Sequence, residues 1–77
     1  MALIANFVRL DKERFQVHDP IDAHISSFDA APGKIVQIDT FGRGTRENPG
    51  KVSQSIQLDR NSAEHLYEIL KAEFGFK

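Results

Sequence analysis

Along residues 51–77 the apolar side chains recur first at every second residue and then at about every 3.6 residues. This change of period constrains the fold more than any other feature. The sequence KVSQSIQLD (51–59) largely alternates, which is typical of a strand with one buried face. Between 61 and 74 the apolar residues recur at helical spacing; they are Ala63, Leu66, Tyr67, Leu70 and Phe74. A helix of about four turns is too short to be stable alone. The sequence therefore predicts a strand followed by a helix docked on a sheet.

The predicted helix has a start and a stop signal. Asn61 and Glu64 fit a capping box, in which the side chain of the first residue accepts from the backbone of the second, and the second reaches back. Gly75 suits the left-handed position that ends many helices. We therefore expect a helix over residues 61–74.

Two further strands are indicated upstream. KIVQIDTF (34–41) is rich in β-forming residues, and DAHISSFDA (22–30) is a second candidate. Ala31-Pro32-Gly33 between them looks like a tight connection, so 22–41 is predicted to be a hairpin. The fold class is then α+β: a curved antiparallel sheet of three to five strands with one C-terminal helix, in β-β-β-α order. The residues expected to be buried are Val36, Ile38, Ile56, Leu58, Leu66 and Leu70.

The first 20 residues leave two interpretations open. LIANFVRL and RFQVH (14–18) have strand composition, and Asp19-Pro20 ends any strand there because proline lacks a backbone donor. The segment is either a paired strand or an arm. The 77 residues form one small domain without cysteine, so no disulfide supports its core. Association of two chains is a common way to bury more apolar surface, and we expect a homodimer.

Composition and charge exclude several classes of function. The net charge is −1, and no apolar run approaches the roughly 20 residues of a membrane helix. The N-terminus lacks the basic and cleavage regions of a signal peptide, which predicts a cytoplasmic protein. His18 and His24 match no standard metal-ligand spacing, and no nucleophile-base pattern stands out. We therefore expect no metal, no cofactor and no enzymatic activity.

The segment FGRGTRENPGK (41–51) concentrates basic and glycine residues in a connection longer than the usual two to five residues. Arg43 and Arg46 offer bidentate phosphate contacts, and Phe41 could stack on a nucleic-acid base. The alternative is an ordinary hairpin connection in which Phe41 is a core residue and Glu47 pairs with an arginine. The sequence leaves both interpretations open.

The order of features over residues 22–74 resembles the positive cofactor four family of transcriptional coactivators, which bind single-stranded DNA. The pieces that carry the resemblance are Gly33-Lys34, VQIDTF (36–41), NPGK (48–51), SIQL (55–58) and the helix from Asn61. The family binds single-stranded DNA or RNA as a homodimer whose sheets form paired grooves. The resemblance thus implies a transcription-related regulator that binds single-stranded nucleic acid. It would place these residues at the nucleic-acid contact: Lys34, Gln37, Phe41, Arg43, Arg46, Lys51 and Ser53.

The sequence also supports a second class of function. Ser53, Ser55, Gln57 and Gln37 form an uncharged polar sheet face, which suits a protein interface as well as a base-binding surface. The near-neutral net charge does not favour nucleic acid. The alternative function is a protein-interaction or assembly module without nucleic-acid activity.

Overall fold

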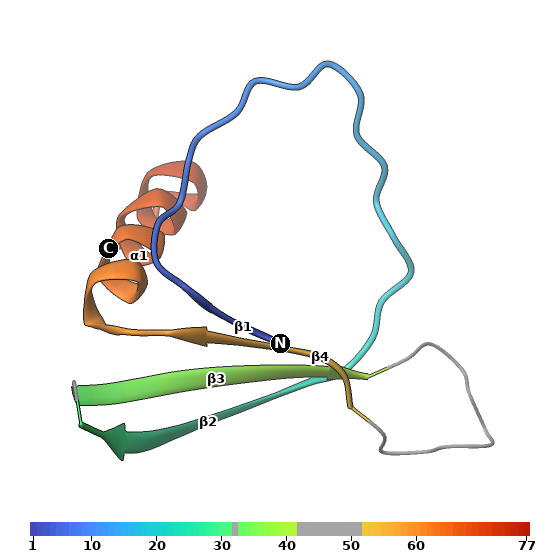
Figure 1. The fold of residues 1–77 in the computed structure, drawn as a ribbon. Coiled ribbons are helices and arrows are strands. Elements are labelled where there is room, and N and C mark those ends of the chain that lie inside the picture. The colour runs from blue at the N-terminus through green and yellow to red at the C-terminus, as the bar shows by residue number, and fades with distance from the viewer. Residues whose placement is uncertain (32, 42–51) are drawn as a thin grey trace, which may run out of the picture.

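The computed structural model describes residues 1–31, 33–41 and 52–77, which form one four-stranded sheet and one helix (Figure 1). The elements are β1 (Ala2–Ile4), β2 (Ala23–Ala30), β3 (Gly33–Phe41), β4 (Val52–Leu58) and α1 (Arg60–Phe74). The order across the sheet is β1-β4-β3-β2. The predicted α+β class with a C-terminal helix is confirmed.

The hairpin and the strand before the helix lie where the sequence predicts them. β2 pairs antiparallel with β3, from Ala23 opposite Thr40 to Ala30 opposite Gly33. Gly33 has φ 132°, a conformation that glycine tolerates at no steric cost. β3 pairs antiparallel with β4, with a shift in register between Thr40 and Phe41. These three strands form the expected antiparallel sheet.

The N-terminal strand departs from the prediction of a purely antiparallel sheet. β1 is three residues long and pairs parallel with β4, so the sheet is mixed. β1 and β2 lie at opposite edges and run in the same direction, which follows from their pairings. The chain between them must therefore return along the sheet and cross its width of about 14 Å. Residues 5–22 make this crossover as a wide arc without secondary structure, so 14–18 is not a strand (Figure 1).

α1 begins one residue earlier than predicted, and its capping box is a different pair. Asp59 is the N-cap: its carboxylate accepts from the Ser62 backbone N–H at 2.9 Å, and the Ser62 hydroxyl accepts from the Asp59 N–H at 3.1 Å. Asn61 is then already helical, and the predicted box of Asn61 with Glu64 is wrong. The predicted stop is confirmed, because Gly75 is left-handed (φ 70°) and donates to the Lys71 carbonyl at 2.9 Å.

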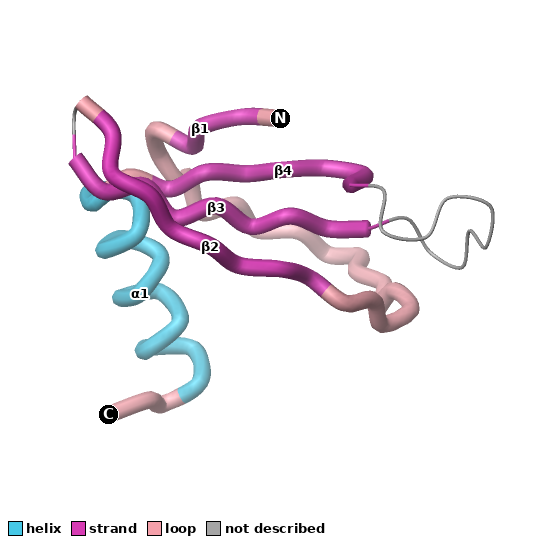
Figure 2. Tube along the Cα trace, turned by 90° about the horizontal axis from the view of Figure 1, so that it is seen from below, coloured by secondary structure: helices cyan, strands magenta, loops and turns pink. Residues whose placement is uncertain are grey.

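The core is smaller than the sequence predicts. Among the described apolar residues, only Ile35 and Leu58 are buried, and Ile35 was not among the predicted core residues. Leu58 is confirmed; the half-buried members of the predicted set are Val36, Ile38, Ile56 and Leu66. Leu70 is 38% exposed, so its predicted burial is wrong. The reason is the direction of α1, which meets the sheet at its first turns and then runs away from it (Figures 1 and 2).

Candidate nucleic-acid interface

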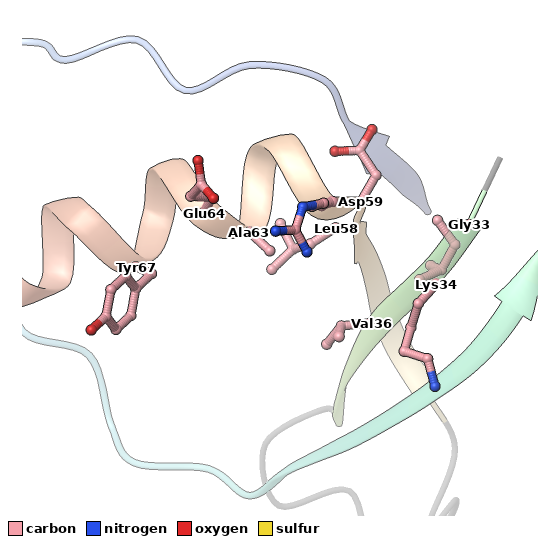
Figure 3. A pocket seen from close by; sticks show the side chains of 10 residues that line it. Gly33, Lys34, Val36, Leu58, Asp59, Ala63, Glu64 and Tyr67 are labelled. Atoms are coloured by element: carbon pink, nitrogen blue, oxygen red, sulfur yellow. The ribbon is translucent and has the colours of Figure 1, made fainter.

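The two faces of the sheet differ in chemistry because side chains alternate along each strand. One face, called here the helix face, carries Val36, Ile38, Ile56 and Leu58. Val36 and Leu58 line a groove together with Ala63 and Tyr67 of α1, which places the helix on this side (Figure 3). The opposite side, called here the polar face, carries Gln37, Asp39, Ser55 and Gln57. α1 therefore does not lie over the polar face, on which Gln37, Asp39 and Gln57 are half-buried and Ser55 is buried. The same alternation sets the buried Ile35 on this face, at the opposite end of β3 from Phe41.

A line of hydrogen bonds crosses the polar face between β4 and β3. Gln57 Nε2 donates to Gln37 Oε1 at 2.9 Å, and Gln37 Nε2 donates to Asp39 Oδ1 at 3.0 Å. The Ser55 hydroxyl donates to the same Asp39 oxygen. Each glutamine amide carries a second N–H and a carbonyl oxygen with two lone pairs, so the band keeps further donor and acceptor capacity. Such groups match the edges of unpaired bases, and equally the backbone of a protein.

Asp39 gives the polar face a negative charge at its centre. Its pKa lies below the ordinary value because the Ser55 hydroxyl, and then the Gln37 amide, donate to the ionised carboxyl. Desolvation acts in the opposite direction, and the nearby His24 lowers the pKa slightly further. The carboxylate is therefore ionised at neutral pH. This negative charge disfavours a phosphate close by but does not repel an uncharged base.

An aromatic pair lies at one end of the polar face. The rings of His24 and Phe41 are 4.6 Å apart between centroids, at an interplanar angle of 66°. His24 is the cross-strand partner of Asp39, which places it beside the hydrogen-bonded band. Phe41 is half-buried and ends β3, immediately before the basic segment of the sequence. Rings at such a position provide a surface on which a base can stack.

The structure brings part of the predicted site together. Gln37 and Phe41 lie on the polar face, and Ser53 is exposed next to Val52, the cross-strand partner of Phe41. Lys34 does not belong to this group. It follows the alternation of the helix face, pairs with Asp29 at 3.5 Å, and lies seven residues from Phe41, which is about 23 Å along a strand. The other predicted residues, Arg43, Arg46 and Lys51, lie outside the described residues.

Sequence reasoning missed His24 and Asp39 as members of this face. The signal was present in the hairpin. A two-residue connection after Ala30 pairs residues whose numbers sum to 63, which sets His24 opposite Asp39. Alternation along β3 already sets Asp39 on the face of Gln37, and this register adds His24 beside it.

No family model, curated protein or solved structure matches this chain. The resemblance to the positive cofactor four family therefore stays a prediction from the residues quoted above. Within the described ranges, no three histidine or acidic side chains gather as a metal site requires. Nor does this part of the chain contain a helix long and apolar enough to span a membrane.

Proposed function

We propose that this chain is a small cytoplasmic nucleic-acid-binding protein that takes single-stranded DNA or RNA onto the polar face, and that it is not an enzyme. One observation carries the proposal. The His24–Phe41 ring pair lies at the end of a hydrogen-bonding band, at the point where the chain enters its most basic segment. Stacking, base-edge hydrogen bonds and phosphate contacts would then meet in one place.

The expected contributions differ in kind. A base stacked on an aromatic side chain contributes roughly 1–3 kcal/mol, largely independent of sequence. Gln37 and Gln57 supply amide groups that hydrogen-bond base edges. Arg43 and Arg46 would neutralise phosphates, so their double replacement by alanine should lower the salt dependence of binding by about one to two units. Rings and amides that contact bases favour a single strand, whose bases are accessible, over a duplex.

The test is a titration with a fluorescently labelled, mixed-sequence single-stranded DNA of about 20 nucleotides, read by anisotropy at low and physiological salt. The matching duplex is the control ligand. Binding of the single strand should be micromolar or tighter and should weaken steeply with salt. Phe41→Ala should weaken it by about 5- to 150-fold, the equivalent of one stacked base.

Lys34→Ala is the matched control variant, because Lys34 lies on the other face of the same strand. We expect it to change the affinity by less than about twofold. Absence of single-strand binding at low salt would contradict the proposal. Equal losses for Phe41→Ala and Lys34→Ala would contradict the assignment to the polar face.

The second candidate function is a protein-assembly module without nucleic-acid activity, and Asp39 favours it. An ionised carboxylate at the centre of the polar face repels phosphates but accepts readily from the backbone N–H groups of a protein. A protein that forms stable complexes with polypeptides and ignores oligonucleotides at low salt would support this candidate instead.

A further inference from the structure

The two edges of the sheet differ in length (Figure 2). The edge at β1 is three residues long, whereas β2 offers eight residues in continuous register with β3. Residues 23–29 are exposed, and within the described residues no backbone hydrogen bond joins β2 to a segment other than β3. An edge strand presents a row of unpaired N–H and C=O groups, because only one of its two sides is paired. β2 is therefore the longer open edge of the sheet.

β2 also lacks the features by which proteins usually protect an open edge. Lysine side chains, prolines and bulges are common means of protection. β2 contains no lysine, arginine or proline, and its register with β3 is regular from Ala23 to Ala30. Its central residues 25–28 are uncharged. The strand is thus able to pair with one more strand along its whole length.

Each face of β2 carries one large apolar side chain that a further strand would cover. Ile25 is 71% exposed on the helix face, opposite Ile38, and Phe28 is 43% exposed on the polar face, opposite Ile35. A strand paired with β2 would place one side chain beside Ile25 and another beside Phe28. These two residues of the added strand would also be three apart, because side chains alternate between the faces. The apolar surface thus predicts a partner segment with the pattern apolar-x-x-apolar.

The charges at both ends of β2 are negative. Asp22 directly precedes the strand and is exposed, and the side chain of Asp29 is 84% exposed. Lys34 Nζ lies 3.5 Å from Asp29 Oδ1, but no lysine or arginine occurs in residues 15–33. A strand beside β2 would lie next to one aspartate at each end, and opposite charges are favourable in such cross-strand pairs. The same carboxylates repel a nucleic-acid backbone, so this edge suits a basic polypeptide.

We infer that the edge of β2 binds an extended segment of a different protein, which pairs antiparallel with β2 as a fifth strand. The segment has the order basic-apolar-x-x-apolar-x-x-basic, which sets its basic residues beside Asp29 and Asp22 and its apolar residues beside Phe28 and Ile25. In strand addition the backbone hydrogen bonds give affinity and the alternating side chains give specificity. Antiparallel pairing is the slightly more stable arrangement. A second copy of β2 does not fit, because it would bring two further aspartates and no lysine or arginine.

The test measures binding of a fluorescently labelled synthetic octapeptide to the full chain by anisotropy at low salt. The peptide has lysine at both ends, valine at its second and fifth positions, and threonine elsewhere. We expect it to bind roughly tenfold or more tightly than the same peptide with glutamate at both ends. This preference should disappear when Asp22→Asn and Asp29→Asn are combined. The reversed sequence should bind more weakly, and tighter binding of that sequence would overturn the antiparallel orientation.

Ile25→Lys tests the position of the site. It removes one apolar contact and adds a lysine to the edge, so the lysine peptide should bind about tenfold or more weakly. Ile25 is 71% exposed, so the chain should keep its fold, which far-UV circular dichroism checks. Leu10→Lys is the matched control, since Leu10 is 73% exposed and follows Arg9, which pairs with Glu73 of α1. It adds the same charge and should leave the dissociation constant within about twofold.

Methylation of the peptide's amides distinguishes strand addition from unspecific charge attraction. In an antiparallel ladder only every second residue directs its N–H to the neighbouring strand. Methylating the even-numbered amides and methylating the odd-numbered amides should therefore differ, and one of the two sets should abolish binding. Equal effects of both sets, or no binding of the lysine peptide, would overturn the inference. So would a peptide-free dimer that Ile25→Lys abolishes, or slow amide exchange at residues 14–18 of the free protein, because a second copy or the chain's own segment would then occupy the edge.

Discussion

The capping box of α1 offers a sharp test of the structure, because the sequence alone favours a different pair of residues. Ser62 is 1% exposed, and its hydroxyl accepts from the Asp59 N–H at 3.1 Å. Ser62→Ala leaves that N–H without its partner, which should cost about 1.5 kcal/mol. The better helix propensity of alanine returns about 0.5 kcal/mol. The net loss is about 1 kcal/mol.

Thermal unfolding followed by circular dichroism at one fixed protein concentration measures this loss. For a domain of this size, about 1 kcal/mol corresponds to a decrease in Tm of roughly 4–8 °C. Glu64→Ala is the matched control: Glu64 is exposed, and its loss should change the stability by less than about 0.5 kcal/mol. A larger loss for Glu64→Ala than for Ser62→Ala would refute the assignment of the box.

Three further outcomes are expected. Asp39→Asn should tighten single-strand binding about two- to fivefold at low salt, because it removes a negative charge some 4–8 Å from the ligand; unchanged or weaker binding in the anisotropy assay would contradict this. The pKa of the Asp59 carboxyl is lowered from 3.8, mainly because the Ser62 backbone N–H donates to it. The ionised carboxyl therefore stabilises the fold fully above pH 3.8, and this contribution is lost as the pH falls below that value. Melting curves from pH 7 to about pH 2 should therefore show a steeper acid loss for the protein than for Asp59→Asn, and parallel curves would exclude this role. Gly75→Ala should cost about 1 kcal/mol in the same melts, because alanine strains at φ 70°; an unchanged Tm would mean that the helix end rearranges.

Local sequence patterns were enough to predict most of the fold. The alternation in β4, the composition of β2 and β3, and the helical stripe gave the order of elements, because each pattern reflects contacts within or beside its own segment. The parallel partner of β4 could not be read in the same way. Only three residues of the N-terminus pair, and their register with β4 depends on a crossover of 18 residues that has no local signal.

The direction of α1 was the other feature beyond sequence reasoning. A helical stripe predicts burial, but it does not state whether the partner surface belongs to the same chain. Leu70 and Phe74 have the right spacing for a core and nevertheless remain exposed in the single chain.

Only part of the candidate site could be predicted, because a pattern within one strand does not show which residues of a neighbouring strand lie beside it. Gln37 and Phe41 share a strand face, so alternation placed them together. Lys34 was grouped with them by the family resemblance, although its position parity sets it on the opposite face. The same alternation already sets Asp39 between Gln37 and Phe41, whereas His24 required the pairing register of the hairpin, which a one-strand pattern does not contain.

Nuclear magnetic resonance on the uniformly ¹⁵N-labelled protein tests the central claim most directly. Addition of a short single-stranded oligonucleotide should shift the amide signals of the polar face, with the largest changes at Asp39, Phe41 and Ser55. The signals of Tyr67 and Phe74 on α1 should stay in place, because the helix lies behind the sheet from the proposed ligand. Shifts confined to α1 and its groove, or no shifts at low salt, would contradict the assignment of the polar face as a nucleic-acid interface.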